Sequence, residues 1–313
     1  MTNDRLLQVA YSFVAAALVA TWMTGIVFWT YFAGAVLLAL GLTVVIKKDM
    51  PKLHGVDKLL PFGRVFFAVP LGVFAAEHFT ITKIIATGVP AWIPGHIFWV
   101  YLVGAALVAA AISIILEEQS RLAAILLGIM IASFVLLLHI PKVVAQPHDR
   151  IVWAVALRDL SFSGGALAFA GARSKALASG KAHWLVTLGR LLIAIGALFF
   201  SVEHFMHPKF VPAVPLGQVM PEWLPARLFW AYFAGVALLV CGACLLINKR
   251  ARLAATCFGG VVFLVVLFVY LPILISKPAD VGNGMNYFAD TLMYCGAILV
   301  LAEALPKEGL PSL

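Results

Sequence analysis

Two Glu-His pairs are the residues in this chain best suited to proton chemistry. Glu77-His78 lies in the stretch "FAAEHFTITK", and Glu203-His204 lies in "FFSVEHFMHP". Each pair closes an apolar run that opens with Gly-Arg, and the two pairs are 126 residues apart. A carboxylate can take up a proton, while an imidazole can donate a hydrogen bond or relay the proton. The same chemistry therefore recurs at two matching places.

Both pairs must be positioned by membrane-spanning helices. The 313 residues are 63% hydrophobic and only 12% charged, with a mean hydropathy of +1.04. Soluble domains contain about 25% charged residues, so this composition excludes that class. The apolar residues fall in blocks of about 20, which suffice to cross a hydrocarbon core about 30 Å thick as helices. The chain is predicted to be an all-α integral membrane protein.

The hydropathy pattern predicts about ten transmembrane helices. They cover residues 6–22, 26–46, 63–80, 96–116, 122–140, 151–171, 184–203, 228–247, 253–275 and 286–305. A cleaved signal peptide is the alternative for the first span, because Ala15-Ala16-Ala17 offers small residues. The preceding region, with Asp4 and Arg5, has no net positive charge, which favours a retained helix.

The basic residues predict the orientation of the chain. With ten alternating spans, fifteen Lys and Arg residues fall on one side and seven on the other. Because positive residues are enriched in cytoplasmic loops, both termini are expected in the cytoplasm. The net charge of +8 then requires no nucleic acid as partner, since the anionic headgroups of the lipid bilayer satisfy the basic loops.

An internal repeat accounts for most of the chain. "PAWIPGHIFWVYLVG" (90–104) matches "PEWLPARLFWAYFAG" (221–235) at an offset of 131 residues, and "RLAA" recurs at Arg121 and Arg252. The sequence therefore predicts a four-helix repeat at 51–175 and another at 176–313. An even number of spans gives the repeats one orientation, related by a pseudo-two-fold axis along the membrane normal. Residues 1–50 form a partial third copy, since "WMTGIVFWTYFAG" (22–34) matches the same pattern.

This four-span unit resembles the DoxX-like family. The features shared are Gly-Arg at the start of its first span, His-Phe at the end, a Pro-rich loop, and Gly-rich second and fourth spans. DoxX-like proteins are small bacterial four-helix membrane proteins named after a subunit of a thiosulfate–quinone oxidoreductase. The resemblance covers about 60–173 and 185–306 and implies a helical bundle in the bacterial inner membrane, linked to quinone redox chemistry. The tandem arrangement and the extra helix pair depart from the single-unit pattern of the family.

Polar residues are expected at one depth in each repeat. Glu77 lies 13 residues from Arg64, so roughly 20 Å along the helix from that end. Arg158 is expected roughly 10–12 Å below the outer surface. Two outer polar chambers follow. The candidates for ligand binding or proton relay are Glu77, His78, His139, Arg158 and Asp159 in the first chamber, and Glu203, His204, Tyr270 and Asp290 in the second.

These chambers have a functional and a structural interpretation. Ionisable groups at membrane depth face a partner or a wet cavity, and a Glu-His pair would suit a quinone headgroup. Alternatively, the pairs bond to loop backbone or to Arg158, and Asp159 and Asp290 join helices. The glycine shared by the copies, at Gly34, Gly104 and Gly235, predicts close helix contact. Arg64 and Arg190 are expected to be interfacial anchors.

Haem or another metal is a competing use of the outer histidines, which are His78, His139, His204 and His207. Tyr270 stands where His139 would recur, so a bound metal is the less favoured reading. The "CGAC" motif at 241–244 is interpreted as small residues packing helices rather than as a redox site.

Three classes of function remain after these arguments. The first is a redox-linked membrane subunit that holds a quinone or a partner oxidoreductase subunit at its outer pockets. The second is a small-molecule transporter, since transporters often combine two repeats with a central site. A structural or chaperone-like membrane protein without ligand is a third option. The catalytic residues and the substrate are not determined by the sequence.

Overall fold

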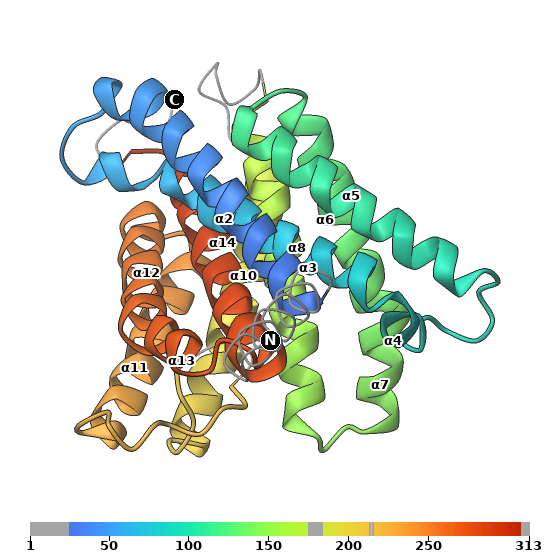
Figure 1. Cartoon of the computed structure of the whole chain (residues 1–313). Helices are drawn as coiled ribbons and strands as arrows, with labels where there is room; N and C mark the ends of the chain where they lie inside the picture. Colours follow the sequence, from blue (N-terminus) through green and yellow to red (C-terminus); the bar gives the residue numbers. More distant parts are fainter. Residues whose placement is uncertain (1–24, 175–183, 213, 215, 308–313) are drawn as a thin grey trace, which may run out of the picture.

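The chain folds as a helical bundle in a computed structural model that describes residues 25–174, 184–212, 214 and 216–307 (Figure 1). Nine helices of this described part are long and apolar enough to cross a membrane. They match nine of the ten predicted spans and confirm the all-helical class. The remaining predicted span, 6–22, lies outside the described residues.

The bundle is built from long helices joined by short helical segments. The long helices are α2 (Ile26–Val44), α3 (Phe62–Thr80), α5 (His96–Leu116), α6 (Ser120–Phe134), α8 (Arg150–Ala172), α10 (Trp184–Met206), α11 (Arg227–Leu246), α12 (Ala251–Val265) and α14 (Tyr287–Ala304). The short segments are η1 (Val45–Asp49), η2 (Met50–Lys52), η3 (Gly55–Leu59), α4 (Thr82–Ala86), η4 (Val135–His139), α7 (Ile140–Ala145), η5 (Val266–Tyr270), α13 (Leu271–Ser276) and η6 (Val281–Asn286).

The two ends of the bundle differ in composition. One end carries residues 45–61, 117–119, 173–174 and 247–250, and is called the basic end here. The opposite end carries the loops at 87–95, 146–149, 207–226 and 277–280, and is called the proline-rich end. Trp92 and Trp223 are exposed at the proline-rich end, as is common for tryptophans at a membrane–water interface.

Helices α3 and α14 form the centre of the bundle. Of the nine apolar helices they are the most buried, and they pack against each other. Helix α14 also packs on α8 and α12, while α3 packs on α2 and α5. Helix α10 lies against α8 and α11. The order of contacts therefore brings α3, α8, α10 and α14, which carry the Glu-His pairs and the predicted Asp residues, into one interior (Figure 1).

Glycines allow these central helices to approach each other closely. A Cβ atom added at Gly165 of α8 would lie 2.5 Å from the Cβ of Ala297 on α14. One added at Gly296 of α14 would lie 2.2 Å from the backbone nitrogen of Phe67 on α3. Both separations are too short for a real side chain. Small residues thus bring α3, α8 and α14 together, as expected for helices packed within a membrane.

The helix contact predicted at the shared glycine is confirmed. A Cβ at Gly104 would meet the Cβ of His78 at 3.0 Å, and a Cβ at Gly235 would meet the Cβ of His204 at 3.3 Å. At Gly34 the nearest atom is a side-chain carbon of the helix α3. The missing side chains on α5 and α11 therefore make room for the two histidines.

A π-helical turn connects α6 to α7, and another connects α12 to α13. Segment η4 ends at His139 and segment η5 ends at Tyr270, each two residues before a proline, Pro141 or Pro272. Proline has no backbone N–H, so the regular hydrogen-bond ladder cannot continue through it, and a π turn is one way to re-register the chain. The helical path therefore continues through each π turn, into α7 after η4 and into α13 after η5.

Candidate functional site

Four of the predicted residues form one hydrogen-bonded chain. His139 Nε2 lies 2.8 Å from Asp159 Oδ2, and Arg158 Nε donates to Asp159 Oδ1 at 2.8 Å. Arg158 Nη1 donates to Asp290 Oδ2 at 2.5 Å. The chain of contacts runs from η4 through α8 to α14. One guanidinium thus serves two carboxylates on two different helices.

This chain is well enclosed. The side chains of Arg158, Asp159 and His139 are 16%, 13% and 13% exposed, and that of Asp290 is 9% exposed. Buried charges are tolerated when they are paired and hydrogen-bonded. The guanidinium also lies over the ring of Phe162, 5.6 Å from its centre. Arg158 therefore fixes α8 against α14 in the half of the bundle nearer the proline-rich end.

Glu203 has a cationic partner. Its Oε2 atom accepts from Arg150 Nη1 at 3.4 Å, and the same nitrogen donates to the backbone oxygen of Leu216 at 2.5 Å. The Arg150 guanidinium also stacks over Phe210, 4.1 Å from the ring centre. Arg150 begins α8, Glu203 lies near the end of α10, and Leu216 belongs to the loop at 207–226. These contacts fasten that loop over the proline-rich ends of α8 and α10.

Glu77 has no such partner. Its side chain is buried, with 8% exposed, and Oε1 has no hydrogen-bond partner among the described residues. Its polar neighbours are Asn286, at the end of η6, and the like-charged Asp290. At the offset of 131 residues, Val281 stands where Arg150 stands, and Ala289 stands where Arg158 stands. Helix α8 therefore supplies both arginines of the site, and none reaches Glu77.

The two histidines use one ring nitrogen in the same way. His78 Nδ1 lies 2.7 Å from the backbone oxygen of Phe74, and His204 Nδ1 lies 2.5 Å from that of Phe200. A carbonyl only accepts, so Nδ1 carries the proton, and in a neutral ring Nε2 is left as an acceptor. His204 is 2% exposed, and its Nε2 has no partner in the part of the chain that the structure describes.

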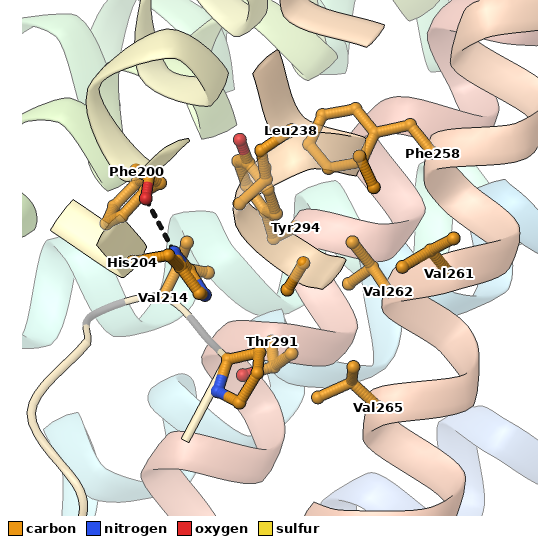
Figure 2. A pocket seen from close by; sticks show the side chains of 13 residues that line it. Phe200, His204, Val214, Leu238, Phe258, Val261, Val262, Val265, Thr291 and Tyr294 are labelled. Carbon is orange, nitrogen blue, oxygen red and sulfur yellow. Dashed lines mark hydrogen bonds between the residues drawn. The ribbon is translucent and has the colours of Figure 1, made fainter. Parts of the chain in front are cut away.

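An apolar pocket begins at His204. Its walls come from α10, α11, α12, α14 and the loop at 207–226, and Figure 2 shows its lining side chains and the bond from His204 to Phe200. The pocket is narrow. The empty space between its side chains is about 410 Å³ with the part open to the surroundings, but the space that a water-sized molecule can occupy is about 30 Å³. Phe200 and Phe258 meet Tyr294 edge-on, with ring centres 6.1 and 5.7 Å apart. His204 is the one titratable lining residue besides Tyr294.

Tyr270 takes the place expected for a second histidine but stays outside the hydrogen-bonded chain. It is fully buried, and its hydroxyl has no partner among the described residues. Its ring stacks on Tyr287 with centres 6.3 Å apart and an angle of 9° between planes. Tyr270 thus packs beside the Asp290 region of α14 rather than bonding to it.

The interpretation as two self-contained chambers needs correction. Arg158 of the first predicted repeat binds Asp290 of the second, and Arg150 of the first binds Glu203 of the second. The sequence places groups by depth, but α8 lies between α10 and α14, so its charges face the other half. The polar residues form one interface between the halves. The suggested bond between a Glu-His pair and Arg158 is not the pairing observed, since the carboxylates that bind Arg158 are Asp159 and Asp290.

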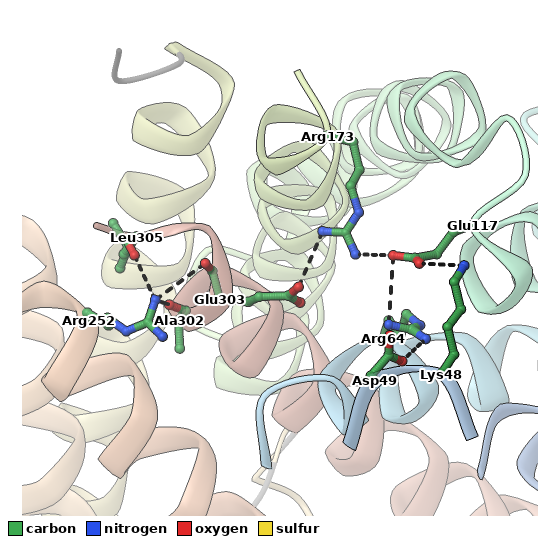
Figure 3. Close-up of polar contacts among 9 residues, drawn as sticks. All are labelled: Lys48, Asp49, Arg64, Glu117, Arg173, Arg252, Ala302, Glu303 and Leu305. Carbon is green, nitrogen blue, oxygen red and sulfur yellow. Dashed lines mark hydrogen bonds and ion pairs between the residues drawn. The ribbon is translucent and has the colours of Figure 1, made fainter. Parts of the chain in front are cut away.

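A second polar network at the basic end was not predicted (Figure 3). Glu117 accepts from Arg173 at 2.6 Å and from Lys48 at 3.3 Å, and Arg173 also lies 3.5 Å from Glu303. Burial alone would raise the pKa of Glu117, but the charges of Arg173 and Arg64 outweigh it and lower the pKa below its ordinary value. The acidic residues of this network lie in predicted loops or near span ends and share no common spacing, so the sequence gives no pattern to find them.

Arg64 and Arg190 differ from the prediction of interfacial anchors. Arg64 is 2% exposed and pairs with Asp49 at 2.5 Å. Arg190 is buried and donates to the backbone oxygens of Leu245 and Leu246 at the end of α11. Both side chains hold neighbouring helix ends together at the basic end instead of reaching toward lipid headgroups. A Gly-Arg pattern alone cannot distinguish these two uses.

Comparison with models of protein families, with curated proteins and with solved structures gives no match for this chain.

Proposed function

We propose that the protein is a DoxX-like, redox-linked membrane protein that holds a quinone-class carrier in the His204 pocket. The observation that carries this proposal is the buried, unpartnered Nε2 atom of His204 in an otherwise apolar, aromatic-walled pocket. Ligand sites typically combine apolar walls with a few polar groups that fix orientation. An unsatisfied buried acceptor is costly, so a ligand hydroxyl that donates to it is favoured.

The residues of the pocket have separate tasks in this proposal. His204 Nε2 accepts a hydrogen bond from the hydroxyl of a reduced, quinol-type ring, while its Nδ1–H stays on Phe200 and fixes the ring. Phe200, Phe258 and Tyr294 offer aromatic faces and edges to the planar headgroup. The valines of α12 exclude water and accommodate an apolar tail. Electrons would pass to or from a partner oxidoreductase subunit.

The proposal includes the membrane arrangement. Residues 51–175 and 176–313 would be two four-helix units of one orientation, with 1–50 as a partial copy. Features that recur at the offset of 131 residues support this, among them the π turns before Pro141 and Pro272 and the capping residues Asp149 and Asp280. The basic end would face the cytoplasm of a bacterial inner membrane. The pocket would then open toward the outer half.

A binding titration tests the proposed function. A short-chain quinol is titrated into the full-length protein in detergent, and affinity is measured by calorimetry. Loss of one buried hydrogen bond in His204→Leu should weaken binding about tenfold. His78→Leu is the matched control, since His78 does not line the pocket, and it should leave affinity unchanged. Val262→Phe, which fills the pocket, should abolish binding. Equal affinity in all folded variants would reject the site.

A transporter is the second candidate, and the Arg158 bridge favours it. Arg158 joins Asp159 and Asp290 between α8 and α14, and rearrangement between two repeats is how many transporters expose a site. Residues 65–76 of α3 are all apolar, however, so no polar path continues along this helix to the basic end. Flux of a solute into proteoliposomes that Arg158→Lys abolishes would favour transport over quinone binding.

A further inference from the structure

We propose that Glu77 is an exchangeable proton-binding residue at the interface of α3 with η6 and α14. The site lies outside the His204 pocket, whose lining does not include Glu77. The inference therefore stands whether or not a quinone-class carrier binds. The ligand of this site is a proton, and its chemical basis is a carboxyl group that the fold buries without supplying a cation.

The described residues around Glu77 provide a hydrogen bond from the Asn286 side chain but no cation and no partner for Oε1. Glu77 Oε1 is buried without a partner, and the Oδ1 atom of its neighbour Asn286 is also buried without one, among the residues described. A carboxylate has only acceptor atoms, whereas a protonated carboxyl is also a donor. One proton on Glu77 supplies the missing O–H and removes a charge that burial disfavours. The unpartnered Oε1 atom and the lack of a cation among the described residues thus point to the neutral acid.

The charged and titratable groups around Glu77 also favour a protonated carboxyl. They are Asp290 and Tyr287 on α14, Arg158 and Asp159 on α8, His139 on η4 and Tyr270 on η5. With Glu77, the cluster contains three carboxylates and the guanidinium of Arg158. Arg150 also acts on Tyr287, but it is paired with Glu203 and adds no net charge. Even a charged His139 leaves the cluster one negative charge in excess. At least one carboxyl must hold a proton for the cluster to be neutral, as closely spaced acids require.

Glu77 is the carboxyl that takes this proton. Asp159 accepts from both Arg158 and His139, and Asp290 accepts from Arg158 at 2.5 Å. Asp159 therefore has two partners that favour its anion, and Asp290 has one, the guanidinium that it shares with Asp159. Among the residues that the structure describes, Glu77 is the one of the three without a cationic partner at hydrogen-bond distance.

The site can exchange its proton with the proline-rich end. Glu77 is three residues from Thr80, where α3 ends, so it lies only about 4.5 Å along the helix axis from the end. Beyond it toward the basic end, α3 is apolar as far as Val65. Proton access is thus from one side only. Helix α14 carries Asp290 toward this site and Thr291 and Tyr294 toward the pocket, so the two sites share one helix.

Infrared spectroscopy of the full-length protein in lipid vesicles tests the inference. A protonated carboxyl gives a C=O stretching band, separate from carboxylate bands, that shifts when water is replaced by D₂O. The wild type at neutral pH should show such a band, and Glu77→Gln should lack it. Glu203→Gln is the matched control and should keep the band, since Glu203 pairs with Arg150.

A second variant decides the matter if Glu77→Gln does not fold. Val281→Arg places an arginine at the position aligned with Arg150, so Glu77 should ionise and the band should disappear with the carboxyl still present. Persistence of the band in folded Glu77→Gln, or in folded Val281→Arg where the first variant fails, would overturn the proposal. Absence of a deuterium-sensitive band from the wild type would overturn it as well.

Discussion

The two Glu-His pairs have the same sequence and the same position near a helix end, yet different atoms are left unsatisfied. In the first pair, Glu77 has a carboxylate oxygen without a partner among the described residues, while His78 does not line the His204 pocket. In the second, Glu203 is paired with Arg150, and the free atom is Nε2 of His204. The difference arises on neighbouring helices: Arg150 and Arg158 on α8 align with Val281 and Ala289.

This comparison shows that the partner helix determines what a recurring motif can do. A carboxylate beside a guanidinium is a structural ion pair, whereas the same carboxylate beside Asn286 can hold a proton. Under the two proposals the pairs have different tasks, proton binding at the first and ligand binding at the second. Variants that exchange or remove the partners test this division.

The largest expected effect comes from Arg158→Leu, which removes the guanidinium that binds both Asp159 and Asp290. Two buried aspartates would lose their partner, and breaking a buried pair costs about 3–5 kcal/mol. We expect that loss in the free energy of unfolding, measured by denaturant titration in detergent micelles. Arg227→Leu, at an exposed position, is the control and should change little. A stability loss no larger than that of the control would contradict the role given to the network.

Arg150→Leu should make Glu203 resemble Glu77. It leaves a buried carboxylate without its cation and Leu216 without a donor, so the free energy of unfolding should fall by about 2–3 kcal/mol. Because replacing both partners by apolar groups is far less costly, Arg150→Leu with Glu203→Leu should recover most of it. If the double variant is as unstable as the single one, the ion pair is not the cause.

A smaller effect is expected at the glycines that face the histidines. The Cβ of Gly104→Ala would meet His78 at 3.0 Å, and that of Gly235→Ala would meet His204 at 3.3 Å. Crowding of this kind costs about 1–2 kcal/mol. Unfolding in detergent should therefore show a loss for both variants, larger for Gly104→Ala. The reverse order would mean that the second pair is packed more tightly than the first.

The smallest effect concerns Glu117, an acid whose partners favour its charged form, in contrast to Glu77. Its pKa is lowered on folding from the ordinary value of 4.5, so its stabilisation is present above that pH and is lost as pH falls through the folded pKa. The loss should be about 1 kcal/mol or less, since the pair is partly exposed. Glu117→Gln should remove this part of the acid dependence. An unchanged acid limb would contradict the assignment.

Much of the fold follows from hydropathy alone. The predicted spans 63–80 and 96–116 agree with α3 and α5 to within one residue. The predicted span 122–140 ends too early, because the helical path extends past Pro141 to Ala145. Instead the helical path continues through η4 into α7, where the proline occupies a first-turn position that needs no N–H donor.

Less of the site could be predicted, because hydrogen-bond partners depend on how helices are rotated and packed. Depth along a helix follows from residue counting, so Arg158, Asp159 and Asp290 were expected near one level. The half of the bundle that each side chain faces does not follow from residue counting, and the assignment of these residues to separate chambers was wrong. In the sequence, Arg150 is a single basic residue next to the start of a predicted span. The repeat has no arginine at the matching position, Val281, and this difference is visible in the sequence.

Nitrogen-15 magnetic resonance of labelled histidines in lipid bilayers tests the division between the two pairs most directly. Spectra are recorded before and after addition of a short-chain quinol, and His78→Asn and His204→Asn identify the two signals. The account predicts that both rings carry their proton on Nδ1 and that only the Nε2 signal of His204 moves when the quinol is added. A shift of the His78 signal instead, or no shift of either, would contradict it.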